Sequence, residues 1–508
     1  MFKFCSRTIC LLIVTLMATE AIAKDMSGWS DKTVCRLLTG EPDNAEFLTE
    51  AQQRELTCDS NAKSGGTKQQ VGGKLIPKKL RSDGYICEPR LTDTYTSNGR
   101  KIEHSFQYTP TSVMKDYTTY SVLLGDRWEM PQGLNPCPND RTLNFYYKRW
   151  LNEIKNNSYM SSISVTKPSP KPREFENLDK NNEFLNKQLQ HNGVLSYLYY
   201  SNGKIIYDGL APQSRFDFKL DDNTELRSNS IGKSIVSYLI GNAICDGYIE
   251  SVDETLVSWP VVRDTLYSSL TLLEILNMRA RDQHVVTESD GFIKTGRWFN
   301  PVSIKSAASN ELKGTKPNKS KKYNYNGFAT NVAMNFMMFK VGDDWDSFLN
   351  KVFQERIKIQ NRFIFQKVIA VDKTDGTGWY SAYASRYDYL RIAVAMMEDW
   401  QNDTCVGKYL KEMNEKKMSV PKDEWAFDSN PKKARQVRGF SSHYGGQFYL
   451  NYKGMAKRNI IGMDGYGGQS ILIDMDNSRV VVVNSASTNY DWYELVYQPI
   501  KTGELREQ

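Results

Sequence analysis

Ser230 and Lys233 stand one helical turn apart and could supply a nucleophile and the base that activates it. A serine hydroxyl is a poor nucleophile and attacks a carbonyl carbon only when a base takes its proton. Lysine acts as that base only when it is neutral, and holding it half neutral at pH 7 costs about 4.6 kcal/mol. Burial shifts a lysine pKa by about 3–5 units, so a desolvated Lys233 could reach that state. The pair therefore predicts acyl transfer from an ester or amide.

The S-x-x-K spacing is frequent in this chain, so the surrounding sequence has to distinguish one tetrad from another. It begins at seven serines: Ser60, Ser112, Ser164, Ser201, Ser230, Ser419 and Ser429. Only Ser230 opens an amphipathic helix, which runs to Ile244 and is stopped by Asp246 and Gly247. Free N–H groups and the helix dipole favour negative charge at such a start. The competing interpretation makes Ser230 an ordinary N-cap and Lys233 a surface residue.

Four segments resemble, in order, the motifs of the serine β-lactamase-like hydrolases. That family includes class C β-lactamases, penicillin-binding-type carboxypeptidases, esterases and 6-aminohexanoate-dimer hydrolases. The segments are residues 230–249 (SIGKSI, then AICDGYI), 270–278 (LTLLEILNM), 325–331 (YNGFATN) and 465–469 (GYGGQ). The resemblance covers approximately residues 185–495. It implies the β-lactamase/transpeptidase-like fold and an acyl-enzyme mechanism.

The resemblance also implies a role for each matching residue. Ser230 would be the acylated nucleophile and Lys233 its base. Tyr325 would relay protons between Lys233, Ser230 and the leaving group, an acid–base role that a positioned side chain can fill. The backbone N–H groups of Ser230 and Gln469 would form the oxyanion hole. Gly468 would let the substrate approach the strand backbone closely, next to Tyr466.

Two positions depart from the family pattern. Gly327 stands where the tyrosine motif carries Asn or Ser, and Tyr323 is a rival for the role of Tyr325. Tyr466 stands where the last motif carries Lys or His, a cation that would pair with a substrate carboxylate. Its absence favours neutral esters or amides over β-lactams and D-Ala-D-Ala peptides. Three arginines could supply the charge instead: Arg279, Arg281 and Arg386.

Other polar and aromatic residues border the expected cleft. Trp379 and Tyr380, in a glycine-rich aromatic segment, are predicted either to line the pocket or to pack in the core. His284 and His443 are interpreted as structural or surface histidines. The sequence contains no G-x-S-x-G, H-E-x-x-H, P-loop or G-x-G-x-x-G pattern, so no metal, nucleotide or dinucleotide cofactor is expected.

Composition narrows the function classes further. The chain has 508 residues, of which 40% are hydrophobic, enough for a sizeable core. Its net charge of +7 is mild for this length and does not indicate a nucleic-acid binder. With only four histidines, the sequence argues against multi-histidine metal sites.

Periodicity predicts an α/β (α+β) hydrolase domain at residues 176–508. Strands at 194–200 and 205–208 are joined by an Asn-Gly turn, and a second hairpin joins strands at 470–473 and 479–483. Helices are predicted near residues 231–246, 271–279, 327–340, 345–354 and 385–400. Strands at both ends with helices between them predict one antiparallel sheet with an inserted helical region.

Residues 1–23 read as a signal peptide, with Lys3 and Arg7, a short apolar run, and a small-x-small site ending at Ala23. We expect a periplasmic or secreted protein without stable membrane insertion. A helical hairpin is predicted at 24–60, a Gly- and Lys-rich linker at 61–85, and a small Tyr/Thr-rich module with its linker at 86–175. This module contains predicted strands at 104–108 and 117–124 and a predicted helix at 143–156.

Six cysteines follow the predicted cleavage point, and an oxidising compartment favours their pairing. Neighbour pairing is predicted, Cys35 with Cys58 and Cys87 with Cys137. Cys245 and Cys405 lie in a different region and are predicted as buried thiols.

The sequence thus predicts an exported serine hydrolase that acts on a small ester or linear amide without a cofactor. A β-lactamase or D-Ala-D-Ala carboxypeptidase is the first alternative. A non-catalytic binding or sensor protein on the same fold, suggested by the residues at 327 and 466, is the second. A structural cell-envelope protein is the third, and the partner of the N-terminal module stays open.

Overall fold

The computed structural model describes residues 34–35, 50–54, 56, the strands between 92 and 131, 160–191, 193–216, 219–286, 303–368, 376–420, 440–486 and 490–507. The predicted signal peptide, the linker at 61–85 and the helix at 143–156 lie outside these residues, as does most of the hairpin at 24–60. Within the described ranges, no helix combines the length and apolar character that crossing a membrane requires.

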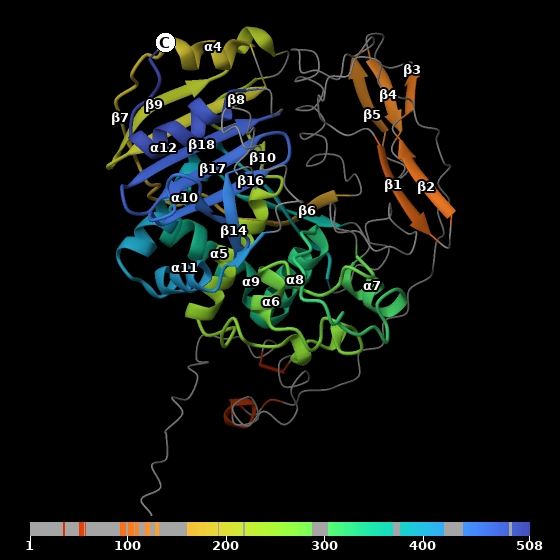
Figure 1. Ribbon diagram of the computed structural model, residues 1–508. Coiled ribbons are helices and arrows are strands. Elements are labelled where there is room, and N and C mark those ends of the chain that lie inside the picture. The colour runs from red at the N-terminus through yellow and green to blue at the C-terminus, as the bar shows by residue number, and fades with distance from the viewer. Residues whose placement is uncertain are drawn as a thin grey trace, which may run out of the picture.

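A large sheet joins the two ends of the hydrolase domain (Figure 1). It has nine strands in the order β13-β14-β15-β16-β17-β18-β8-β9-β7. The strands are β7 Glu176–Asn177, β8 Val194–Ser201, β9 Lys204–Leu210, β13 Met418–Ser419, β14 Ser441–Gly445, β15 Phe448–Tyr452, β16 Ile460–Gly465, β17 Gln469–Asp474 and β18 Arg479–Ser485. Among the described strand pairs, β7 and β9 alone run parallel. Because β18 pairs antiparallel with β8, the predicted sheet built from both ends of the domain is confirmed.

The two predicted hairpins are also confirmed. Asn202 and Gly203 turn β8 into β9 with φ angles of 48° and 89°. Positive φ at both central residues is the geometry that suits the twist of a two-residue hairpin, and Asn-Gly favours it. The second hairpin joins β17 to β18, with Asp474 paired to Arg479.

The inserted helices follow the predicted periodicity in most places. They are α5 Ile231–Cys245, α6 Leu272–Leu276, α7 Ile304–Asn310, α8 Gly327–Val341, α9 Trp345–Asn350, α10 Arg386–Gln401 and α11 Cys405–Glu415. A π-helical segment, Lys351–Ile357, continues α9. The prediction omitted α7 and α11, although Val406, Tyr409, Leu410 and Met413 of α11 are buried at helical spacing.

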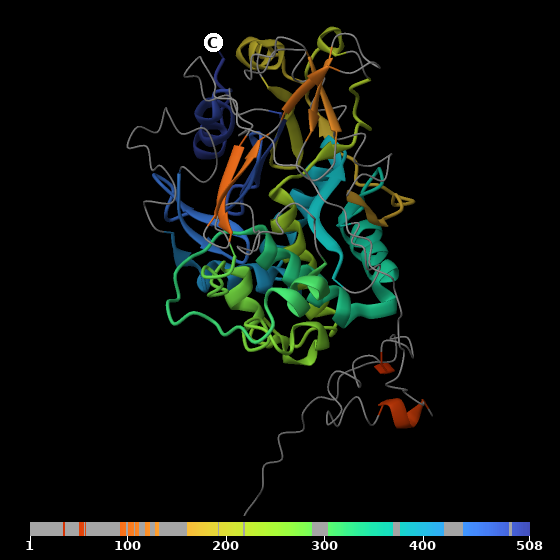
Figure 2. The ribbon, with the colours of Figure 1, turned by 90° about the vertical axis from the view of Figure 1, so that its right-hand side faces the viewer.

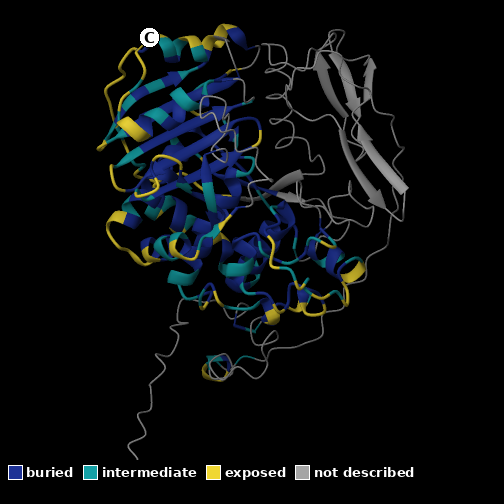
Figure 3. Ribbon diagram, viewed as in Figure 1, coloured by how far each residue is buried: buried dark blue, intermediate teal, exposed yellow. Residues whose placement is uncertain are grey.

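Helices cover the large sheet on both sides (Figures 1 and 2). On one side lie α4 (Glu183–His191), α12 (Gln498–Thr502) and the π-helical segment Tyr493–Tyr497. Tyr197 and Tyr199, alternate residues of β8, donate hydrogen bonds to the carbonyls of Leu495 and Pro499 on this side. Helices α5 and α10 pack on the other side. Buried residues fill the sheet and both interfaces (Figure 3).

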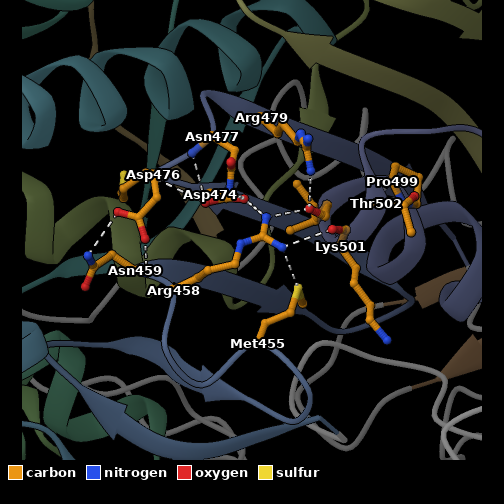
Figure 4. Close-up of polar contacts among 12 residues, drawn as sticks. Met455, Arg458, Asn459, Asp474, Asp476, Asn477, Arg479, Pro499, Lys501 and Thr502 are labelled. Atoms are coloured by element: carbon orange, nitrogen blue, oxygen red, sulfur yellow. Dashed lines mark hydrogen bonds and ion pairs between the residues drawn. The ribbon is translucent and has the colours of Figure 1, made fainter.

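A network of guanidinium groups fixes the C-terminal helix on the sheet (Figure 4). Arg458 forms an ion pair with the buried Asp474 and donates to the carbonyl of Ile500 at 2.6 Å and of Lys501 at 3.1 Å. Arg479 donates to the same Ile500 carbonyl at 3.1 Å. The last carbonyls of a helix have no partner within it, so these arginines satisfy the end of α12.

Cys245 and Cys405 form a disulfide, so their prediction as buried thiols is wrong. Cys245 ends α5 and Cys405 begins α11, and the two helices pack side by side. Their Cα atoms are 5.8 Å apart across a sequence separation of 160 residues. Only the tertiary packing of the two helices brings these residues together. Cys35 is disulfide-bonded, but Cys58, Cys87 and Cys137 lie outside the described residues, so the predicted neighbour pairing stays a prediction.

A second sheet lies beside the helices and has the order β10-β12-β11-β6. Its strands are β6 Met160–Val165, β10 Leu226–Arg227, β11 Ile364–Val368 and β12 Gly378–Ala384. Strand β6 precedes the predicted domain start at 176 and nevertheless pairs with β11. Two further small sheets combine β1 Thr92–Ser97 with β2 Arg100–Ser105, and β3 Gln107–Pro110 with β4 Tyr117–Ser121 and β5 Arg127–Pro131.

Candidate active site

Ser230 lies immediately before α5, with its backbone in the helical region and its side chain half-buried. Its hydroxyl makes no capping hydrogen bond to the first turn of the helix. Ser230 therefore occupies the N-cap position of α5, but its side chain does not cap the helix. Its backbone N–H donates to no acceptor within the described residues. Both groups are thus available to a substrate.

Lys233 is buried in the first turn of α5, with only 2% of its surface exposed. Its Nζ donates a hydrogen bond to Ser230 Oγ at 3.3 Å. The interpretation of Lys233 as a surface residue is therefore wrong. The helix places both groups on one face because residues three apart in a helix are neighbours.

Gly232 allows α5 to begin directly against β12. A Cβ atom at this position would lie 2.1 Å from the Tyr380 carbonyl oxygen and 2.9 Å from Ser228 Oγ. Any side chain there would push the strand away from the helix. The missing side chain therefore brings Tyr380 next to the residue after Gly232, which is Lys233.

Two tyrosine rings surround the Lys233 ammonium. The Nζ atom lies 3.6 Å from the ring centroid of Tyr380 and 5.0 Å from that of Tyr325. Tyr325 is half-buried, whereas Tyr323 is 3% exposed and packs its ring against Tyr444. Of the two rival tyrosines, Tyr325 is the one in contact with Lys233.

The charge state of Lys233 follows from opposing influences. Burial disfavours the ammonium form and acts to lower the pKa of Lys233, but the phenol groups of Tyr325 and Tyr380 raise it, and the pKa lies above its ordinary value. Within the described residues no carboxylate lies at ion-pair distance from Nζ. The raised pKa favours the protonated amine, in contrast to the neutral lysine that burial alone predicts.

A buried carboxylate holds the segment that carries Tyr325. Asp282 is fully buried and accepts hydrogen bonds from Asn324 Nδ2 at 2.6 Å, Asn326 Nδ2 at 3.2 Å and the Tyr267 hydroxyl at 2.5 Å. Asn326 also caps α8. Both residues that flank Tyr325 are thus fixed to one carboxylate. Sequence reasoning missed Asp282, and the asparagines on either side of Tyr325 were the available signal.

Two side-chain amides of α8 hold β12 in register with the site. Asn331 Oδ1 accepts from the Tyr380 N–H at 3.1 Å. One turn later, Asn335 both accepts from the Gly378 N–H at 2.8 Å and donates to its carbonyl at 2.9 Å. The helix that follows Tyr325 therefore also positions Tyr380.

The hairpin between β16 and β17 lies beside the nucleophile. Asn229 Nδ2 donates to the Tyr466 carbonyl at 2.6 Å, and Tyr466 itself is 47% exposed. Gly468 turns with a φ of 85°. The Gln469 side chain is fully buried and donates to the Ser485 carbonyl at 2.5 Å. The Gln469 side chain is therefore engaged inside the sheet and does not face a substrate.

Of the remaining predicted residues, Trp379 lies next to the site, and the two histidines contact other parts of the chain or solvent. Trp379 is half-buried with its ring stacked on Tyr380, at 5.9 Å between centroids. His284 is exposed, and His443 contacts Ser442, Asn451 and Ser419 on the edge of the large sheet.

The three arginines considered as substrate cations each have a partner elsewhere. Arg279 donates to the Lys321 carbonyl. Arg281 pairs with Glu274 at 3.5 Å. The buried Arg386 pairs with Asp208 and Asp222.

No family model matches the chain, and no curated protein shows significant sequence similarity to it. Similar solved structures include a Bacillus anthracis protein described as a 6-aminohexanoate-dimer hydrolase, with 14% identity, a TM-score of 0.48 and coverage of 71% of this chain and 94% of that chain. A Bacteroides dorei protein described as a β-lactamase has 13% identity, a TM-score of 0.44 and coverage of 60% and 92%. A D-stereospecific amidohydrolase from Streptomyces sp. has 12% identity, a TM-score of 0.41 and coverage of 64% and 100%.

Proposed function

We propose that this chain is a serine hydrolase that cleaves a small ester or linear amide through an acyl-enzyme on Ser230. One observation supports this most directly: the buried Lys233 donates to Ser230 Oγ at 3.3 Å. A half-buried hydroxyl next to a buried amine, with no other hydrogen bond in the described residues, is a nucleophile with a proton carrier.

The first step transfers one proton and forms one bond. The step uses the minor form in which Lys233 has lost its proton: Ser230 Oγ attacks the carbonyl carbon while the hydroxyl proton passes to the neutral Lys233 Nζ, directly or through the Tyr325 hydroxyl. The carbonyl electron pair moves to oxygen, where the N–H groups of Ser230 and Gln469 stabilise it. The same proton then passes to the leaving oxygen or nitrogen as its bond to carbon breaks. Water releases the acyl group by the reverse sequence.

The substrate class follows from the charges around the site. Tyr466, whose backbone carbonyl accepts from Asn229, is an uncharged, half-exposed residue at the position where the resembling family carries a cation. Arg279, Arg281 and Arg386 are held by other partners. We therefore infer a neutral ester or linear amide as substrate, with β-lactams and D-Ala-D-Ala peptides as the alternatives.

A fluorophosphonate probe tests the nucleophile. We expect labelling of the purified protein at Ser230 and its loss in Ser230→Ala. Ser419→Ala is the matched control, because Ser419 also opens an S-x-x-K tetrad and lies 3.3 Å from His443 Nε2. Labelling that persists in Ser230→Ala would disprove the proposed mechanism. Labelling at Ser230 without turnover of any substrate would favour a binding or sensor protein.

A substrate panel tests the specificity. The panel combines p-nitrophenyl esters, a linear amide dimer, a chromogenic cephalosporin and a D-Ala-D-Ala peptide, each with wild type and Ser230→Ala. We expect turnover of an ester or of the amide dimer that depends on Ser230. Turnover of the cephalosporin or the D-Ala-D-Ala peptide alone would instead establish one of the alternatives.

We also infer export and a separate N-terminal module. The pattern at residues 1–23 supports cleavage after Ala23, and the Cys245–Cys405 disulfide suits an oxidising compartment. Residues 24–60, 61–85 and 86–175 are proposed as a hairpin, a linker and a small module ahead of the hydrolase domain. Mass spectrometry of the exported protein tests the first point, with an N-terminus at Lys24 expected. Limited proteolysis within residues 61–85 tests the second.

A further inference from the structure

The geometry points to Tyr380 as a positioning residue whose ring face holds the Lys233 ammonium against the nucleophile. This inference rests on the proposed function, because it assigns a second aromatic partner to the same lysine. Tyr380 belongs to β12, whereas Tyr325 precedes α8, so the two rings reach Lys233 from different elements.

The distances distinguish the two tyrosines. Lys233 Nζ lies 3.6 Å from the Tyr380 centroid, which places the cation on the ring face, and 5.0 Å from the Tyr325 centroid. An ammonium over an aromatic face is attracted by the ring quadrupole, most strongly where water is excluded. Lys233 is 2% exposed. Tyr380 is therefore the closer source of cation stabilisation, which leaves the Tyr325 phenol to exchange protons.

Several features of the chain place Tyr380 there. Gly232 lets α5 approach the Tyr380 backbone, and Asn331 accepts from the Tyr380 N–H at 3.1 Å. Trp379 stacks on the Tyr380 ring. The ring is thus held through backbone and side chain, as a positioning role requires.

Titratable groups near Lys233 come from several elements of the domain. Tyr325 and Tyr380 contact the ammonium, and their phenols raise the pKa of Lys233 against the opposing effect of burial. Tyr444 of β14 lies behind Tyr325, at 6.0 Å between ring centroids. The Tyr409 hydroxyl of α11 forms a hydrogen bond with Ser237 Oγ, one turn along α5. Asp464 of β16 contributes to raising the pKa of Tyr449 and of Tyr452. Within the described residues, none of these other groups forms an ion pair with Lys233.

Two substitutions separate the ring from the hydroxyl. Tyr380→Phe keeps the aromatic face, and Tyr380→Leu removes it. The titration of Lys233 is followed by NMR of protein labelled at lysine ¹³Cε, with the signal assigned by Lys233→Met. We expect Tyr380→Phe to titrate below wild type, because it loses the hydroxyl that raises the Lys233 pKa, and Tyr380→Leu, which also loses the ring face, to titrate lower than Tyr380→Phe by about one unit or more.

The pH dependence of Ser230 labelling by the fluorophosphonate is the second readout, and its midpoint should move with the NMR titration. A wild-type midpoint in Tyr380→Leu, or an equal shift in Tyr380→Phe, would overturn the inference. If Tyr380→Leu does not fold by circular dichroism, Tyr380→Met replaces it. The NMR readout needs no substrate, so failure to hydrolyse anything would contradict the proposed function but not this inference.

Discussion

Two regions of the chain carry nearly the same tetrad and use it in opposite ways. Residues 201–204 read SNGK and residues 230–233 read SIGK. In the first, Asn202 and Gly203 adopt positive φ and form a hairpin turn. Lys204 leaves the turn half exposed and pairs with the exposed Glu176 at 2.7 Å. In the second, the tetrad starts a helix, and Lys233 is buried against two aromatic rings without a carboxylate partner in the described residues.

The difference shows that the S-x-x-K spacing alone does not make an active site. An ammonium in water with a carboxylate beside it is a solvated surface charge, and such a pair contributes about 0–1 kcal/mol. The same group in a dry, aromatic environment exchanges its proton only with the few groups that touch it. Helix start, burial and the close approach of β12 to Gly232 separate the candidate active site from the hairpin turn.

The largest expected effect concerns the two lysines. Lys233→Met should lower kcat/KM for the best ester by about 10²–10⁴-fold, because the proton carrier is lost. Lys204→Met should leave kcat/KM within about twofold and change the free energy of unfolding by under about 1 kcal/mol. Steady-state kinetics and urea denaturation check both. Equal activity losses in the two variants would remove the distinction between the regions.

The disulfide at the far end of α5 is expected to affect stability without affecting chemistry. Replacing both Cys245 and Cys405 by Ala should lower the free energy of unfolding by about 2–4 kcal/mol. Because Ser230 lies at the opposite end of the helix, kcat/KM of the folded variant should match wild type. Urea titration and kinetics below the unfolding transition test this. An activity loss in the folded variant would show that the two ends of α5 are coupled.

Substitutions of Gly232 and Gly203, the glycines of the two tetrads, test the same comparison. Gly232→Ala would place a methyl group 2.1 Å from the Tyr380 carbonyl oxygen, and we expect a stability cost of about 1–3 kcal/mol. The displaced site should also lose about 10²-fold in kcat/KM. Gly203→Ala meets no atom within 4 Å but has a φ of +89°, so strain of about 1–2 kcal/mol is expected with activity unchanged. A fully active Gly232→Ala would contradict the close approach of α5 and β12.

The smallest effect concerns a buried and an exposed carboxylate. Burial raises the pKa of Asp282 above its ordinary value of 3.8, against the lowering effect of its hydrogen bonds. The folded state then retains a proton that the unfolded state has lost, so this contribution to stability is complete below pH 3.8 and is lost as pH rises through the folded pKa.

Denaturation of wild type and Asp282→Asn between pH 4 and neutrality tests that direction. The stability of wild type relative to the variant should fall as the pH rises. Glu176→Gln, which removes an exposed carboxylate, is the control and should change stability by under about 1 kcal/mol throughout. A relative stability that rises with pH would show that the hydrogen bonds to Asp282 outweigh its burial.

Local patterns predicted much of the fold. The Asn-Gly turn, the apolar periodicity of α5 and the strands at both ends of the domain were readable because each depends on neighbouring residues. The helical spacing predicted Ser230 and Lys233, the resemblance to the hydrolase family added Tyr325, and the structure places Lys233 Nζ beside both Ser230 Oγ and the Tyr325 ring. Reasoning from local patterns passed over α11, whose buried residues have a clear helical period, and consequently missed the disulfide that α11 forms with α5.

The contacts that complete the site were not predictable in this way. Asp282 binds the residues on both sides of Tyr325, and Asn331 positions Tyr380, but each joins segments that are distant in the sequence. No local pattern reports which distant residues meet. Trp379 and Tyr380 were therefore assigned to pocket or core with equal weight.

The sequence by itself determined which residues begin a helix, which form a turn, and that a serine and a lysine share one helical face. These follow from backbone conformational preference and from the period of apolar residues over a few turns. Only the tertiary structure decided that Lys233 is buried against two aromatic rings. Its charge depends on the sum of burial and aromatic contacts from β12 and the segment before α8, and that sum exists only once the chain has folded.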